Sequence, residues 1–155
     1  MSSNPIDDVL HAKSVAVVGA TPSGNWGGGG FLAGLIQYDF KGAIYPVNPK
    51  YTEAMGLKVY PTLLDIPEQV DYVISCVPAR LALGILEQAV QKGVKTTHLF
   101  TARLAETGRT EGIETENKIL ELAKKSGMRL IGPNCMGVYA PAYGISFHSD
   151  FPKES

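Results

Sequence analysis

Cysteine is scarce in this chain, and so is net charge. Its 155 residues include only Cys76 and Cys135, which lie far apart, so the sequence offers neither a disulfide framework nor metal-ligand spacing. Lysine and arginine number 14 against 15 acidic residues, giving a formal net charge of −1. Nucleic acids and anionic membranes select strongly positive fields, so this balance argues against both as the main partner.

Long hydrophobic runs are also missing. No apolar stretch approaches the ~18 residues of a membrane span, and the N-terminal MSSNPIDDVLHAKS has no apolar core of a signal peptide. These absences and the isolated cysteines lead us to expect a cytoplasmic protein. Hydrophobic residues make up 45% of the chain, which fits one globular domain with a real core.

Apolar runs and helical patterns alternate along the chain. Strands are predicted at 14–18, 43–47, 72–77, 96–100 and 128–131, with helices at about 26–38, 80–91 and 111–126, a short strand at 57–59 and a helical turn at 62–66. This alternation predicts an α/β, Rossmann-like doubly wound fold, with a mainly parallel sheet and helices on both faces. Ligands of such sheets bind beyond the carboxyl ends of the strands, at the switch point, so we expect the site there.

A glycine-rich stretch, VVGATPSGNWGGGG, covers residues 17–30 and begins inside the first predicted strand. A P-loop would need Lys and then Ser or Thr after its last glycine, but Asn25 and Trp26 follow Gly24. The dinucleotide motif G-x-G-x-x-G matches only in part, because Thr21 occupies its middle position. The loop therefore predicts phosphate binding but argues against direct ATP hydrolysis.

The end of the second predicted strand, YPVNPKY, limits which phosphate-containing ligands fit the site. An NAD-binding fold usually places Asp or Glu in this region to bond the ribose hydroxyl, whereas this chain has Asn48 and Lys50. A lysine attracts a phosphate on the ribose, so NADP and coenzyme A (CoA) both fit. The alternative is that Lys50 is an ordinary solvated turn residue.

Three motifs in order carry a resemblance to a known family: VVGATPSGNWG, then IYPVNPKYTEAMGLKVYPTLLDIPEQVDYVISCVPA, then IGPNCMGVYAP. From about Ser14 to its end, the chain resembles the CoA-binding domain of NDP-forming acyl-CoA synthetases, relatives of the succinyl-CoA synthetase α subunit. The resemblance implies no catalytic or metal-binding residue here, and a CoA site made of Gly19, Thr21, Pro22, Ser23, Gly24, Asn48, Lys50, Tyr51, Val77, Pro78, Ala79, Phe100, Thr101 and Ala102.

The same resemblance implies the chain's organisation and partners. Residues 1–140 would form the CoA-binding domain, and residues 141–155 a tail leading toward an absent second domain. That domain would carry a phosphohistidine, and an ATP-grasp portion would bind the nucleotide. The chain would then hold CoA for thiolysis of an acyl phosphate made elsewhere, and would be inactive as a ligase alone. The alternatives are a CoA- or NAD(P)-sensing regulator without chemistry, and an NADP oxidoreductase.

One position departs from the family pattern. After the fourth strand the family often reads SAGFAE, whereas this chain reads TARLAE, with Arg103 in place of a glycine. Arg103 either blocks a close approach or adds a cation near a phosphate.

Several other residues have a structural and a functional interpretation. Cys135 in GPNC is either a nucleophile or part of a turn toward the next domain, and we favour the turn, because Asn134 tolerates left-handed backbone. For His11, His98 and His148 we expect no role in the site. We expect Trp26 to pack at the helix start rather than stack on an adenine. The glycines at 27–30 fit a helix that another segment approaches closely; the alternative is a loose loop.

Overall fold

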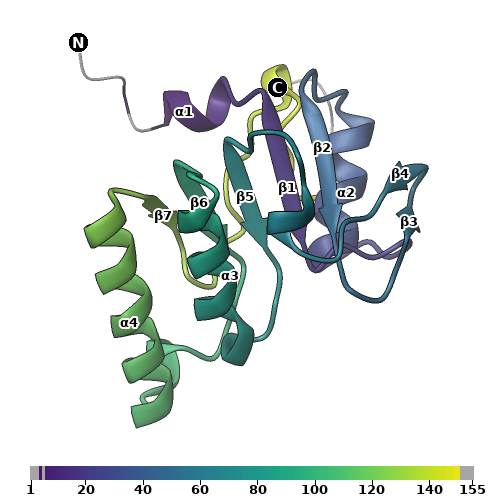
Figure 1. The fold of residues 1–155 in the computed structure, drawn as a ribbon. Coiled ribbons are helices and arrows are strands. Elements are labelled where there is room, and N and C mark those ends of the chain that lie inside the picture. The colour runs from purple at the N-terminus through teal and green to yellow at the C-terminus, as the bar shows by residue number, and fades with distance from the viewer. Residues whose placement is uncertain (1–3, 5, 151–155) are drawn as a thin grey trace.

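A computed structural model describes residue 4 and residues 6–150. Its centre is a five-stranded parallel sheet in the order β2-β1-β5-β6-β7, accompanied by a separate two-stranded hairpin (Figure 1). The sheet strands are β1 (Ser14–Val18), β2 (Ala43–Val47), β5 (Tyr72–Ser75), β6 (Thr96–Leu99) and β7 (Arg129–Ile131), and the hairpin is β3 (Glu53–Ala54) and β4 (Leu57–Lys58). The helices are α1 (Asp7–Leu10), α2 (Gly27–Gln37), α3 (Ala79–Gln91) and α4 (Thr110–Ser126), with 3₁₀ turns at η1 (Leu63–Asp65), η2 (Ala105–Thr107) and η3 (Pro141–Tyr143).

The sheet order creates a switch point between β1 and β5. Strand β1 pairs with β2 on one side and with β5 on the other, both in parallel. Helix α2 connects β1 to β2 on one side of the switch point. On the other side, α3 connects β5 to β6 and α4 connects β6 to β7. All five strands run the same way, so their carboxyl ends share one edge of the sheet. The predicted doubly wound fold is confirmed.

Two hydrophobic layers cover the two faces of the sheet. Val15 and Val17 of β1 pack with α1, α2 and the C-terminal segment near Ile145. The alternate residues Ala16 and Val18 pack with α3 and α4 on the opposite face. Figure 1 shows α3 and α4 side by side, with the yellow C-terminal trace running along the other face of the sheet. All five residues of β1 are buried, as predicted for a strand covered on both faces.

The glycines of α2 bring this helix against two other stretches of backbone. A Cβ atom at Gly28 would lie 2.1 Å from the carbonyl oxygen of Gly19, at the end of β1. Further along the helix, a Cβ at Gly34 would lie 2.9 Å from the carbonyl oxygen of Ser146 in the C-terminal segment. The expected close approach is therefore confirmed, and the alternative of a loose loop is wrong for this helix.

The sequence predicts a short strand at 57–59, which is present as β4, but it predicts neither β3 nor the turn that joins the two strands into a hairpin. Its antiparallel strands are joined by Met55 and Gly56, which both have positive φ angles, 51° and 79°. Such two-residue turns are normally signalled by Asn-Gly or Asp-Gly, and a methionine at positive φ gives no such signal. Helix α1 is also absent from the prediction, because its four residues are too short to show a helical period.

None of the helices in the described ranges is long and apolar enough to cross a membrane.

Candidate functional site

Four loops lie next to one another along the carboxyl edge of the sheet, after β2, β1, β5 and β6. The first two are joined by Asn48, whose side-chain amide donates a hydrogen bond of 2.8 Å to the carbonyl of Ala20. The amide oxygen of the same side chain accepts from the backbone N–H of Lys50 at 3.0 Å. Both polar atoms of Asn48 thus serve the backbone, which makes it a residue that positions the loops.

The loops after β1 and β5 meet at Gly19. This residue has a φ of +86°, and a Cβ atom on it would lie only 2.7 Å from the carbonyl oxygen of Cys76. The N–H of Gly19 donates to Val47, and the N–H of Cys76 donates to Val18. Only glycine satisfies both this conformation and this contact. Burial raises the pKa of the Cys76 thiol.

The loops after β5 and β6 are joined by the buried hydroxyl of Thr101. It donates a hydrogen bond of 2.9 Å to the carbonyl of Val77. The carbonyl of Thr101 in turn accepts from the N–H of Asn134, after β7, also at 2.9 Å. Asn134 has a φ of 48°, which confirms the predicted left-handed turn. The edge of the sheet is therefore a connected set of loops.

The loop after β1 is open to solvent and suited to an anion. Pro22, Ser23 and Gly24 are exposed, while the hydroxyl of Thr21 donates to the Ser23 carbonyl at 2.7 Å and closes a turn. Helix α2 begins directly afterwards with no side-chain cap and no acidic residue in its first turn. A helix N-terminus carries unpaired N–H groups and a partial positive charge, which favour a phosphate.

Lys50 and Tyr51 lie on the next loop along the edge, and both are exposed. Across the described ranges, no carboxylate lies within ion-pairing distance of the Lys50 ammonium. This cation is available to a ligand bound across the loops after β1 and β2.

The Trp26 side chain does not pack at the helix start as expected. It is 65% exposed and contacts Phe100 edge to face, with the ring centroids 5.6 Å apart. The four helix residues that follow it, 27–30, are all glycines and offer no side chains to cover an indole. The tryptophan therefore lies at the surface beside two predicted site segments rather than packed within the helix start.

His98 and Cys135 lie close together but do not form a nucleophile and base. The Nε2 atom of His98 donates to the backbone carbonyl of Cys135 at 2.6 Å, and the Cys135 sulfur accepts from the N–H of Gly137. His98 is fully buried, and this burial lowers its pKa. The neutral ring supports the turn, so the turn interpretation of Cys135 fits the structure better than the nucleophile.

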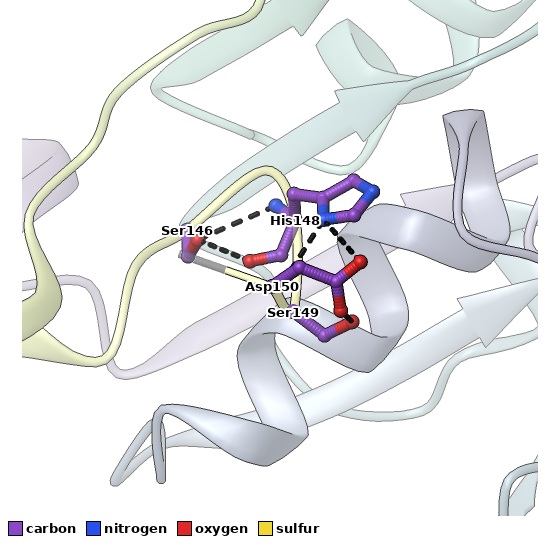
Figure 2. A network of polar contacts seen from close by, with 4 residues as sticks. All are labelled: Ser146, His148, Ser149 and Asp150. Atoms are coloured by element: carbon purple, nitrogen blue, oxygen red, sulfur yellow. Dashed lines mark hydrogen bonds and ion pairs between the residues drawn. The ribbon is translucent and has the colours of Figure 1, made fainter. Parts of the chain in front are cut away.

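The C-terminal segment brings serine, histidine and aspartate side chains together, but not as a catalytic triad (Figure 2). The hydroxyl of Ser146 donates to the backbone carbonyl of His148, and that of Ser149 donates to the carboxylate of Asp150. The imidazole Nδ1 accepts from the backbone N–H of Asp150. Both hydroxyl protons are thus given to groups other than the ring, and these contacts shape a turn. The described residues also contain no group of three or more potential metal ligands.

A family model described as a CoA binding domain matches residues 13–141. The chain belongs to this family. The resemblance drawn from the sequence motifs is therefore confirmed.

Relatives of this CoA-binding domain include ADP-forming ligases. An acetate–CoA ligase [ADP-forming] II of Archaeoglobus fulgidus is 41% identical over 131 residues, which are 84% of this chain and 19% of that protein. The α subunit of acetate–CoA ligase [ADP-forming] I of Pyrococcus furiosus is 39% identical over 142 residues, covering 88% of this chain and 30% of that protein. The chain thus spans about a fifth to a third of these relatives.

A solved structure shares the fold over nearly the whole chain. It is a dinucleotide forming acetyl-coenzyme A synthetase 1 of Ca. Korarchaeum cryptofilum, in complex with phosphate and ADP. The TM-score is 0.87 at 33% identity, and the match covers 97% of this chain and 32% of that one.

Proposed function

We propose that this domain binds CoA across the four connected loops and presents its thiol to an acyl phosphate formed on other domains or subunits of an acid–CoA ligase. One observation carries the proposal: the loops after β2, β1, β5 and β6 are joined by Asn48, Gly19 and Thr101 into one surface, in a chain that belongs to the CoA-binding family. The ADP-forming names of its relatives support the ligase context.

The residues of this chain have positional roles in the proposal. The N–H groups of the loop at 21–24 and of the start of α2 bind the pyrophosphate. Lys50 contacts the ribose phosphate, and the segments at 77–79 and 100–102 contact the remainder of the coenzyme. Because their side-chain links fix these loops before the ligand arrives, little ordering is needed on binding.

The chemical step takes place on the CoA sulfur. The thiolate attacks the carbonyl carbon of the acyl phosphate, a C–S bond forms, the C–O bond to phosphate breaks, and inorganic phosphate leaves. Holding the thiol in place lowers the entropic part of this barrier. The acyl phosphate is made with a nucleoside triphosphate on a phosphohistidine domain and an ATP-grasp portion, so the chain alone is not expected to form acyl-CoA.

The test compares CoA with dephospho-CoA by calorimetry. We expect CoA to bind more tightly, and Lys50→Ala to remove the difference, which is about 1–3 kcal/mol for a charge-assisted hydrogen bond. Lys118→Ala is the matched control, because Lys118 is an exposed lysine on α4. Equal affinities of the two ligands for the unmodified chain would refute the role of Lys50.

A second titration, with NADPH, separates this function from a redox sensor or oxidoreductase. We expect no binding at micromolar concentration. Saturable NADPH fluorescence changes in the absence of CoA binding would contradict the proposal.

A further inference from the structure

A cavity of about 250 Å³ lies between the first turns of α3 and α4, which are side by side. Its lining includes Arg80 from α3, Arg103 from the loop after β6, and Arg109 at the start of α4. Three exposed arginines from three separate elements thus line one hollow. We call it the arginine cavity.

The arginine cavity carries an excess of positive charge. Among residues 4 and 6–150, none of the three guanidinium groups has a carboxylate within ion-pairing distance. Glu111 is the one acidic residue in the lining, so the cations outnumber it by three to one. Guanidinium groups hold their charge at all ordinary pH values. The cavity therefore attracts an anion at any pH at which the protein is folded.

The other nearby carboxylates are engaged by backbone. Glu106 accepts hydrogen bonds from the N–H groups of Arg103 and Leu104 through its two oxygens. Glu116 accepts from the N–H of Ala105 at 2.9 Å. These hydrogen bonds hold the loop after β6, and among the described residues neither carboxylate lies within ion-pairing distance of the three guanidinium groups.

Arg103 itself has an unusual backbone. Its φ is 68°, a left-handed conformation that costs a non-glycine residue about 1 kcal/mol or more. The adjacent Leu104 is fully buried, and α4 packs so tightly on it that a Cβ at Gly112 would lie 2.4 Å from the Leu104 carbonyl oxygen. The loop is thus held rigidly with an arginine at a position where glycine would be less strained.

The N-terminal ends of α3 and α4 add to the positive electrostatic potential of the arginine cavity. Neither α3 nor α4 has a side-chain cap at its first turn, and α3 has no acidic residue there. Their partial positive ends therefore reinforce the guanidinium groups.

We propose that the arginine cavity binds a phosphate group. Planar guanidinium groups match the paired oxygens of a phosphate, and the volume suits a small ion or a single phosphate of a larger ligand. Two sources share this chemistry: free inorganic phosphate, and a phosphate of CoA, since Ala79 and Ala102 of the proposed CoA site directly precede Arg80 and Arg103. The cavity does not require that the proposed ligase function be correct.

The experiment titrates the full chain with inorganic phosphate at low ionic strength, followed by calorimetry and phosphorus NMR. Arg103→Gly is the key variant, because glycine suits the left-handed backbone and the fold should be retained or stabilised. We expect it to weaken phosphate binding about tenfold, and Arg80→Gln to do likewise. Lys118→Gln removes one exposed charge elsewhere on α4 and should change affinity less than twofold.

Competition with CoA then distinguishes the sources. Displacement of phosphate by CoA would assign the cavity to the coenzyme, whereas simultaneous binding would assign it to a separate phosphate; either result upholds the site. Absence of saturable phosphate binding would overturn the proposal. So would binding that Arg103→Gly and Arg80→Gln leave unchanged in folded protein, because the loop after β1 would then be the phosphate site. A chain that binds phosphate here but not CoA would contradict only the proposed function.

Discussion

Gly28→Ala tests whether the packing of α2 on the loop after β1 is as tight as the structure shows. The new methyl group would lie 2.1 Å from the Gly19 carbonyl oxygen and 2.9 Å from the Ala20 nitrogen, whereas ordinary contacts begin near 3.4 Å. Both neighbours are backbone atoms, and the N–H of Gly19 is bonded to Val47. The helix and the loop must therefore separate by more than about 1 Å, since no rotamer change relieves the contact.

The expected loss of stability follows from two opposing effects. Overpacking of this kind costs about 1–3 kcal/mol. Alanine recovers up to about 1 kcal/mol through its higher helix propensity. Gly84→Ala isolates the second effect, because the added methyl group on α3 would meet nothing within 4 Å beyond the backbone of its own helix. We expect Gly84→Ala to stabilise the chain. Gly28→Ala should be less stable than Gly84→Ala by about 1–3 kcal/mol, because the helix-propensity gain is common to both and the overpacking remains.

Urea unfolding followed by circular dichroism measures both variants, and CoA calorimetry reports the loop. Gly28→Ala should also bind CoA more weakly, since it displaces the loop that is proposed to bind the pyrophosphate, while Gly84→Ala should bind CoA normally. If the two variants have the same free energy of unfolding, the close approach of α2 to Gly19 is not present in solution, and the reasoning fails.

Three further predictions concern single side chains. Trp26 is the only tryptophan and is 65% exposed, so CoA binding should shift its fluorescence to shorter wavelength; an unchanged spectrum at saturating CoA would contradict its placement beside the site. Burial lowers the pKa of His98, so the unfolded chain binds its proton more readily and the free energy of unfolding should fall as pH drops below about 6.5. That fall should be reduced in His98→Gln and kept in the exposed control His11→Gln; equal pH profiles would refute it. Cys135→Ser should leave CoA affinity nearly unchanged, because Cys135 supports the turn through its carbonyl contact with His98; a loss above tenfold with intact circular dichroism would place GPNC in the pocket.

The strands and long helices could be predicted because each leaves a local pattern in the sequence: a short apolar run for a buried strand, and apolar residues at helical spacing for a helix. Every predicted sheet strand is present, with ends that differ by at most two residues. The strand predicted at 72–77, for example, extends past Ser75, where β5 ends. Apolar residues such as Val77 continue beyond the last paired residue, so composition alone overestimates the strand.

The contacts between loops could not be predicted, because they join residues that are distant in sequence. The family resemblance places Asn48 in the CoA site, which stays a prediction. The sequence does not predict that both its polar atoms bind backbone, one of them 28 residues away at Ala20. The resemblance also places Thr101 in the site, but the bond of Thr101 to Val77 depends on the neighbouring position of β5 and β6. The arginine cavity likewise draws its residues from three elements, and only Arg103 stands out in the sequence, as a departure from a glycine.

The glycines of α2 have a consequence for how the domain opens. This helix contacts the loop after β1 through Gly28 and Gly29. It contacts the segment at 146–148 through Gly30 and Gly34. At these glycines the helix packs directly on backbone, and no side chain can change rotamer to fill a gap. We therefore expect that neither the loop after β1 nor the segment at 146–148 can move away without loss of the packing of α2. Amide hydrogen exchange should therefore report the loop, α2 and this segment as one cooperative opening unit, whose protection rises together when the loop is occupied.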